Sequence, residues 1–234
     1  MIKLIFYFLP FLSLFLPNLW VNYVLKKNNE TLPDMPFTGN QLGKKLLQEN
    51  NLENVLIESA KQVDHYNPLE KKIHINEDKL NKKSITSIAV VAHEIGHAIQ
   101  DKENYKPLLL RQKLVEKTIL FQRIGSFLLI IGLPSIFAIT KSPFVTFLAA
   151  MIIMGCLSTN VLIHLITLPV EFDASSKRAL PILQKYVPKE NMRQCRSVLR
   201  AAALTYLAQS IVSIFRLKII LFSILNILKS IVRR

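Results

Sequence analysis

Apolar and polar residues are arranged in long blocks along this chain. Four blocks are mostly hydrophobic and lie at residues 4–25, 119–140, 144–170 and 201–228. A helix needs about 20 residues to cross the hydrocarbon core of a bilayer, so the pattern predicts a membrane protein. No small-residue cleavage site follows the first block. Residues 1–25 are therefore predicted to form an uncleaved N-terminal membrane anchor rather than a signal peptide.

The region between the first two apolar blocks has the mixed composition of a soluble domain. Helices are predicted over residues 38–50 and 84–100, because apolar residues fall on one helical face and each segment begins with a Thr or Ser that can cap it. Residues 55–57 and 72–75 have strand character. These elements indicate a small α+β domain.

The later apolar blocks raise a question of topology. Residues 119–140 and 144–170 are separated by three residues, which predicts two antiparallel transmembrane helices in a hairpin. The last block contains Arg216 and Lys218, whose charges are costly in hydrocarbon. For this block a single span, a broken helix and an interfacial amphipathic helix all remain open.

Composition and charge support a membrane location. Half of the 234 residues are hydrophobic, and the net charge is +14. Residues 26–118 hold 15 basic and 13 acidic side chains, so most of the excess lies beside or within the apolar segments. Such cations orient membrane spans and contact anionic headgroups. Nucleic-acid binding is therefore not expected, and the positive-inside rule places the mixed domain in the cytoplasm.

Cys156 and Cys195 lie far apart in unlike surroundings, so no structural disulfide is predicted. The sharpest chemical signal is instead the sequence His-Glu-Ile-Gly-His at residues 93–97. On a helix His93 and His97 project from one face about 5–6 Å apart, so both imidazoles can reach one Zn²⁺. Glu94 is rotated by about 100° from His93, which places its carboxylate near a metal-bound water as a general base.

The alternative to a zinc site is a chance match on an ordinary amphipathic helix. The predicted cap, the adequate length of the helix and the small number of histidines in the chain argue against it. Gly96 fits a zinc site as a small residue that lets another backbone or a substrate come close to the helix.

A catalytic zinc needs a third protein ligand and an open position. Glu171 is the favoured candidate, because an acid at the end of an apolar block is hard to explain as a surface charge. Asp173 could orient an imidazole, although two residues along a helix turn it about 200° away, so support of the following segment stays open. His164 is a further candidate, but a buried histidine with a structural role is the more ordinary interpretation.

Four stretches of the chain carry a resemblance to a known family, at residues 64–68, 92–101, 168–175 and 200–206. With the order of the apolar blocks, they make the chain similar to the YugP-like family of bacterial membrane zinc metallopeptidases. More loosely, the chain resembles the gluzincin peptidases, in which a downstream Glu completes the site. The resemblance implies a zinc-dependent membrane endopeptidase with one Zn²⁺ held by His93, His97 and Glu171, and with Glu94 as the general base. The wider membrane gluzincins carry Asp four residues after the ligand Glu, whereas this chain has Ser175.

The expected fold is an α+β zincin-like domain fused to transmembrane helices, in a predominantly α-helical membrane protein. The expected segments are an N-terminal anchor (1–25), a zincin-like domain (26–118), a transmembrane hairpin (119–170), a third-ligand helix or basic loop (171–203) and a C-terminal membrane helix with a basic tail (204–234). We expect a multi-pass protein of the bacterial cell membrane with its active site on the cytoplasmic side. Its expected substrates are peptides or membrane proteins.

Two weaker features concern substrate binding. Ile73, His74 and Ile75 could form an edge strand that pairs with an extended peptide, or a plain structural strand. His65 and Tyr66 could donate hydrogen bonds to the tetrahedral oxyanion of peptide hydrolysis, or could only stabilise a turn.

Three other functions compete with that of a surface endopeptidase. Intramembrane proteolysis would place the two histidines in a long apolar span, but the polar residues 101–104 follow them directly. A catalytically inactive zinc-binding membrane scaffold or chaperone would have no use for the carboxylate of Glu94. Transport would require polar residues along the spans, and the apolar blocks contain few.

Overall fold

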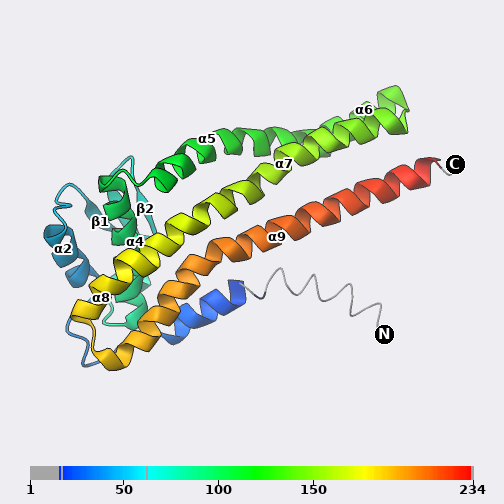
Figure 1. Cartoon of the computed structure of the whole chain (residues 1–234). Helices are drawn as coiled ribbons and strands as arrows, with labels where there is room; N and C mark the ends of the chain where they lie inside the picture. The colour runs from blue at the N-terminus through cyan, green and yellow to red at the C-terminus, as the bar shows by residue number, and fades with distance from the viewer. Residues whose placement is uncertain (1–15, 17, 62, 233–234) are drawn as a thin grey trace, which may run out of the picture. The chain divides into compact units, whose positions relative to one another are not determined.

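The structure of the protein, a computed structural model, describes residues 16, 18–61 and 63–232 (Figure 1). The chain divides into two compact units, each built from segments far apart in sequence. The site unit comprises residues 16–109 and 167–205. The described part of the helical unit comprises residues 110–166 and 206–232. Most of the predicted N-terminal anchor lies outside the described residues, and residues 18–27 are helical.

The first predicted helix of the soluble region is confirmed as α2, Gly39–Glu49. Thr38 accepts a hydrogen bond from the backbone N–H of Gln41, and the Gln41 side chain accepts one from the backbone N–H of Thr38. This capping box satisfies two backbone donors that the helix leaves free. Leu42 and Leu46 are buried, as their spacing on one helical face predicts.

A mixed sheet of three short strands has the order β1-β3-β2, with β1 (Leu56–Ala60) parallel to β3 (Lys72–Asn76) and β2 (His65–Asn67) antiparallel to it. The two predicted strands correspond to β1 and β3. The sequence pattern does not predict β2, whose three residues depend on pairing with β3. The prediction of an edge strand at Ile73, His74 and Ile75 requires correction, because β3 is the central strand and both isoleucines are completely buried.

The segment at 171–203, expected to be a helix or a basic loop, is helical over most of its length. It contains the end of α7 (Pro143–Phe172), the π-helical η2 (Asp173–Ala179), α8 (Leu180–Tyr186), a 3₁₀ turn (Lys189–Asn191) and the start of α9 (Met192–Val232). Apolar residues such as Ala179, Leu183 and Val198 are buried in the core of the site unit. Most of the charges that favour a loop in the sequence therefore lie on the exposed faces of helices.

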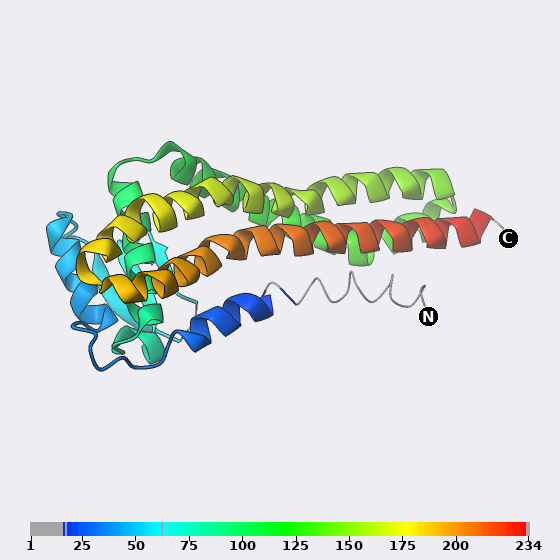
Figure 2. The same ribbon diagram turned by 60° about the horizontal axis from the view of Figure 1, so that its bottom comes forward.

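Helix α4, Ile85–Lys102, is the second predicted helix and passes through the core of the site unit. Ser84 caps it by accepting a hydrogen bond from the backbone N–H of Ser87. The short helix α3 (Glu77–Leu80) precedes it. Helix α4 lies among the other elements of the site unit (Figure 2). Because it contacts α2, β2, η2 and α8, every residue from Ile85 to Ala98 is buried.

The helical unit contains most of α5 (Lys106–Phe127), the π-helical η1 (Leu128–Gly132), α6 (Leu133–Thr140) and parts of α7 and α9. A Cβ atom on Gly125 of α5 would stand 2.9 Å from the Cβ of Cys156 on α7. The two helices are thus neighbours, as the short break between the apolar blocks predicts. Helix α9 is continuous, which excludes the broken helix considered for residues 201–228.

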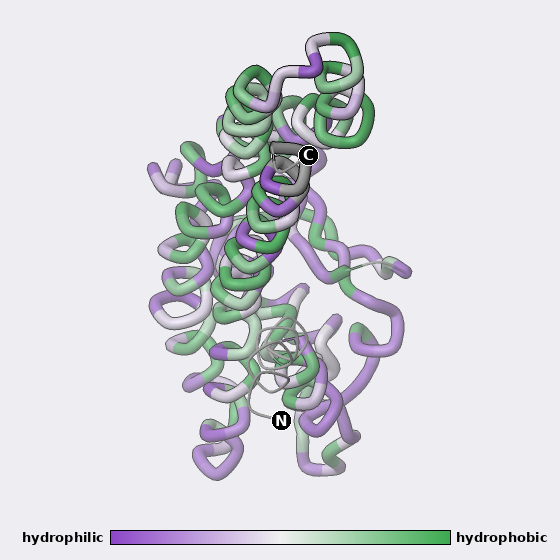
Figure 3. The backbone as a smooth tube through the Cα atoms, turned by 90° about the vertical axis from the view of Figure 1, so that its right-hand side faces the viewer, coloured by the Kyte–Doolittle hydropathy of each residue, from purple (hydrophilic) through white to green (hydrophobic). Residues whose placement is uncertain are grey.

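Three helical runs in the described part of the chain are long and apolar enough to cross a membrane: Lys106–Thr140, Pro143–Tyr186 and Lys189–Asn226. Hydrophobic residues extend along these helices (Figure 3), and large apolar side chains such as Phe127, Ile139 and Ile152 are exposed on them. Exposed apolar surface of this extent is typical of proteins that are covered by a membrane or a partner. The fold is therefore the predicted combination of an α+β domain with membrane-type helices.

Candidate metal centre

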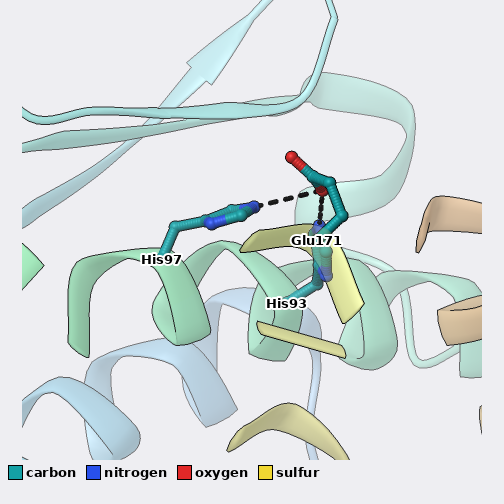
Figure 4. A group of neighbouring side chains, drawn as sticks. All are labelled: His93, His97 and Glu171. Carbon is teal, nitrogen blue, oxygen red and sulfur yellow. Dashed lines mark hydrogen bonds and ion pairs between the residues drawn. The ribbon is translucent and has the colours of Figure 1, made fainter. Parts of the chain in front are cut away.

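Two imidazoles and one carboxylate meet in the core of the site unit (Figure 4). The Nε2 atoms of His93 and His97 lie 3.1 and 3.4 Å from the same Oε2 atom of Glu171. One candidate ligand atom from each residue lies within 4.8 Å of the other two. Among the described residues, this is the one such group of three or more His, Cys, Asp or Glu side chains.

The positions of these side chains follow from two helices. His93 and His97 are one turn apart on α4, and their rings meet edge to face with centroids 4.7 Å apart. Glu171 comes from the last turn of α7. All three residues are buried, so their charges and lone pairs face one another rather than bulk water.

The hydrogen bond at Nδ1 determines which nitrogen of His93 is free. The Ser175 hydroxyl lies 2.9 Å from His93 Nδ1 and donates its single proton to the carbonyl oxygen of Leu199, 3.1 Å away. Ser175 must therefore accept from His93, so Nδ1 carries the proton. The Nε2 atom of His93, which faces Glu171, is then the nitrogen that could bind a metal ion.

Gln100 orients the imidazole of His97 in the same way. The amide nitrogen of Gln100 donates to the Val170 carbonyl oxygen and to Asp173 Oδ2, both at 2.9 Å. The amide orientation is thereby fixed, and its oxygen accepts from Nδ1–H of His97 at 2.9 Å. Both histidines thus offer Nε2 to a common point. Two imidazole nitrogens and a carboxylate are a donor set that suits Zn²⁺.

Asp173 acts on the imidazole of His97 through Gln100. Its carboxylate also accepts from Arg178 Nε at 2.7 Å, and Arg178 in turn pairs with Glu103 at 2.9 Å. In a regular α-helix each residue rotates by about 100°, which would point Asp173 away from α4. The π-helical η2 has a different rotation per residue. A wide turn therefore lets Glu171, Asp173 and Ser175 all face α4, which the regular helical spacing does not predict.

Glu94 is buried beside this group. Burial raises the pKa of the Glu94 carboxyl to about 7; the carboxylates of Glu171 and Asp64 also raise it, whereas His93 and the backbone N–H of Tyr66 lower it. Tyr66 belongs to β2, so this strand donates a hydrogen bond to the Glu94 side chain. A carboxyl group with a pKa near neutrality is well suited to accept and release a proton.

The remaining predicted residues lie on the sheet or in the helical unit. The Tyr66 hydroxyl donates to Asp101 at 2.6 Å, and Lys71 pairs with the same carboxylate oxygen at 2.5 Å. His65 stacks on His74 of the neighbouring strand, with ring centroids 4.8 Å apart. His164 lies in the helical unit near Tyr206, outside the cluster of three ligand candidates.

Gln100 belongs to this site but is not predicted from the sequence. It stands three residues after His97, where a helix presents the same face. Its role depends on contacts with Val170 and Asp173, which are about 70 residues away in sequence. The spacing from His97 is a signal, but it cannot identify the acceptors.

Comparisons with known proteins indicate the family of the chain. The model of a family described as "Putative neutral zinc metallopeptidase" matches residues 3–225. A Bacillus subtilis (strain 168) protein described as "Putative membrane protease YugP" is 30% identical over 225 residues, which cover 92% of this chain and 94% of that protein. No solved structure matches the chain significantly.

Proposed function

The chain belongs to the neutral zinc metallopeptidase family, and from this premise we propose that it is a membrane-bound zinc metalloendopeptidase. The proposed ligands are His93, His97 and Glu171, a gluzincin-type set that binds one Zn²⁺ per chain. The proposed substrates are peptides or membrane proteins.

The observation that carries the proposal is the convergence of three buried donor atoms whose histidines are each held at Nδ1. When bound, zinc supplies a Lewis acid that polarises the scissile carbonyl and makes water more acidic. Gln100 and Ser175 fix the tautomers of the two imidazoles, so their Nε2 atoms are available as ligands. Two oriented imidazoles that face one buried carboxylate fit a metal ion at their common point.

Glu94 supplies the proton transfer in this proposal. It is not one of the three converging ligands, yet it is buried beside them. Its carboxylate accepts the proton of the attacking water and passes it to the leaving amine, for which a pKa of about 7 is suitable. A zinc site with a purely structural role would not need this carboxyl group.

The proposed location is the cytoplasmic face of the bacterial membrane, in a protein that spans the bilayer several times. Three helical runs could cross a membrane. Basic residues flank the apolar helices at Lys113, Lys117 and Arg123 and again at Lys177 and Arg178, while the opposite tip of the hairpin carries Lys141. The positive-inside rule then puts the site unit in the cytoplasm.

Zinc content and proteolysis of purified full-length protein test this proposal. Wild type and Glu94→Gln should each carry about one zinc per chain, and Glu94→Gln should not cleave a fluorogenic protein substrate. Glu171→Ala should lose both zinc and activity, whereas Glu190→Ala, a matched change of an exposed acid, should keep both. A wild type without zinc after metal is supplied would refute the proposal. Zinc without any dependence of cleavage on Glu94 would favour a zinc-binding scaffold.

A further inference from the structure

A pocket with a volume of about 980 Å³ opens on the site unit beside the start of α9. None of the candidate zinc ligands or their hydrogen-bond partners lines it. Its wall combines cations with an aromatic and an aliphatic side chain, from Trp20, Lys189, Arg193, Arg196, Arg200 and Leu204. The pocket is therefore separate from the metal centre and differs from it in chemistry.

The cations of this pocket form a stripe. Arg193, Arg196 and Arg200 are spaced by three and four residues, which places them on one face of α9. Lys189 lines the same pocket from the preceding 3₁₀ turn. All four are exposed, and within the described part of the chain none forms an ion pair with a carboxylate. No Asp or Glu lines the pocket. Four neighbouring like charges repel one another unless an anion binds between them.

The opposite face of the same helix is fixed. Cys195, Val198 and Leu199 are buried in the core of the site unit, so the stripe cannot rotate away from the surface. The Leu199 carbonyl oxygen also accepts from Ser175. The basic face is consequently held in place by the same packing that orders the metal centre.

The change from basic to apolar residues along α9 indicates which kind of anion would fit the pocket. The helical run Lys189–Asn226 begins with the basic stripe and continues into a sequence apolar enough to span a membrane. Leu204 lines the pocket where the basic part of α9 gives way to the apolar part. Trp20 adds an indole, a group that is enriched at the level of lipid headgroups. A ligand with a phosphate at one end and acyl chains at the other matches both halves.

We propose that this pocket binds the phosphate headgroup of an anionic phospholipid. Arginine guanidinium groups bind phosphate oxygens through paired hydrogen bonds. The indole of Trp20 and the side chain of Leu204 contact the glycerol and the first acyl carbons. A free phosphate would leave these apolar groups without a partner. Lipid binding at this pocket does not require peptidase activity.

Trp20 is the single tryptophan of the chain, so its fluorescence reports on the pocket directly. The full-length protein is reconstituted in phosphatidylcholine nanodiscs that contain a small, equal fraction of either brominated phosphatidylglycerol or brominated phosphatidylcholine. The anionic lipid should quench Trp20 more strongly. Each arginine near an anionic phosphate favours binding by about fivefold, so Arg193→Gln/Arg196→Gln/Arg200→Gln should abolish the preference.

Two further variants separate this site from general surface charge. Arg193→Lys/Arg196→Lys/Arg200→Lys keeps the charges but removes the paired guanidinium hydrogen bonds, so it should weaken the preference without abolishing it. Lys44→Gln/Lys82→Gln/Lys83→Gln removes three exposed cations that do not line the pocket, and it should quench like wild type. The thermal midpoint and zinc content of every variant serve as controls of folding.

Three results would overturn the proposal. The first is equal quenching by the two brominated lipids in wild type. The second is loss of the preference in millimolar inorganic phosphate, which would assign the pocket to a free anion. The third is a shift of Trp20 emission by a polyglutamate peptide without any lipid preference, which would assign it to an acidic peptide.

Discussion

The carbonyl oxygen of Ala174 occupies the place beside Gly96 where a side chain would begin. A Cβ atom on Gly96 would stand 2.8 Å from this oxygen and 3.3 Å from the carbonyl carbon and Cα of Ala174. Helix α4 and the π-helical η2 therefore meet through their backbones. This contact brings the helix that carries His93 and His97 close to the segment that follows Glu171.

Gly96→Ala should destabilise the protein and weaken zinc binding, because the added methyl group meets rigid backbone rather than a flexible side chain. The expected loss in the free energy of unfolding is about 1–3 kcal/mol, as for other overpacked cores. Gly155→Ala is the matched control, since its added Cβ would meet no described atom within 4 Å apart from its chain neighbours and the backbone of its own helix. Thermal unfolding and zinc content measure both effects, and equal behaviour of the two variants would contradict the close contact.

Gln100→Leu and Ser175→Ala should each lower zinc affinity by about 10- to 100-fold, because each removes the acceptor that orients one imidazole. Competition with a zinc chelator of known affinity measures the change. Gln48→Leu, at an exposed position of α2, should bind zinc like wild type. An unchanged affinity in both buried variants would mean that the tautomers are set in another way.

Glu94→Gln should stabilise the zinc-free protein at pH 8. Because the folded-state pKa of Glu94 is raised from 4.5 to about 7, its contribution to stability is complete below pH 4.5 and is lost as the pH rises through 7. The glutamine variant cannot ionise, so it should gain on the order of 2–3 kcal/mol at pH 8 and little at pH 4. Denaturant unfolding in the presence of a chelator, at both pH values, measures the difference. A gain of the same size at both pH values would exclude ionisation of Glu94 as its cause.

Tyr66→Phe should make stability less sensitive to alkaline pH. Burial and the hydrogen bond to Asp101 raise the pKa of the Tyr66 phenol above its ordinary value of 10.0. The unfolded chain therefore loses this proton first, and wild type loses stability as the pH rises above about 10. Phenylalanine removes that contribution. Unfolding curves between neutral and alkaline pH compare the two slopes, and parallel curves would contradict the prediction.

The proposed topology predicts opposite labelling of two positions. In a background that carries Cys156→Ala and Cys195→Ala, Thr140→Cys at the tip of the hairpin should react with an impermeant maleimide in intact cells. Lys82→Cys in the site unit should react only after the membrane is opened. Both side chains are exposed on the protein, so only the membrane determines whether the reagent can reach them. The reverse pattern would place the site unit outside the cell.

Local signals account for the parts of the fold that the sequence predicts. Thr38 and Ser84 cap their helices as expected because a cap depends on residues only three positions away. The His-Glu-x-x-His pattern on α4 is likewise a property of one helix, and it brings His93 and His97 onto one face. These features need no knowledge of the distant chain.

Features that depend on distant contacts could not be predicted. Strand β2 is too short to be recognised without β3, and Gln100 gains its role from Val170 and Asp173. The π-helical turn at η2 has no periodic signature and occurs where this segment packs closely on α4. Residues 171–203 contain many exposed charges, so their composition resembles that of a loop. The apolar residues buried on the inner faces of these helices are therefore not recognised from the sequence.

The order of the ligands along the chain has a consequence for biosynthesis. Glu171 follows His93 by 78 residues, and the whole α5–α6–α7 hairpin is synthesised between them. A nascent chain that ends before α7 is complete contains both histidines and Glu94 but no third ligand. The proposed metal site can therefore form only after the α5–α6–α7 hairpin has been synthesised, whereas the apolar run Lys189–Asn226 follows the last ligand.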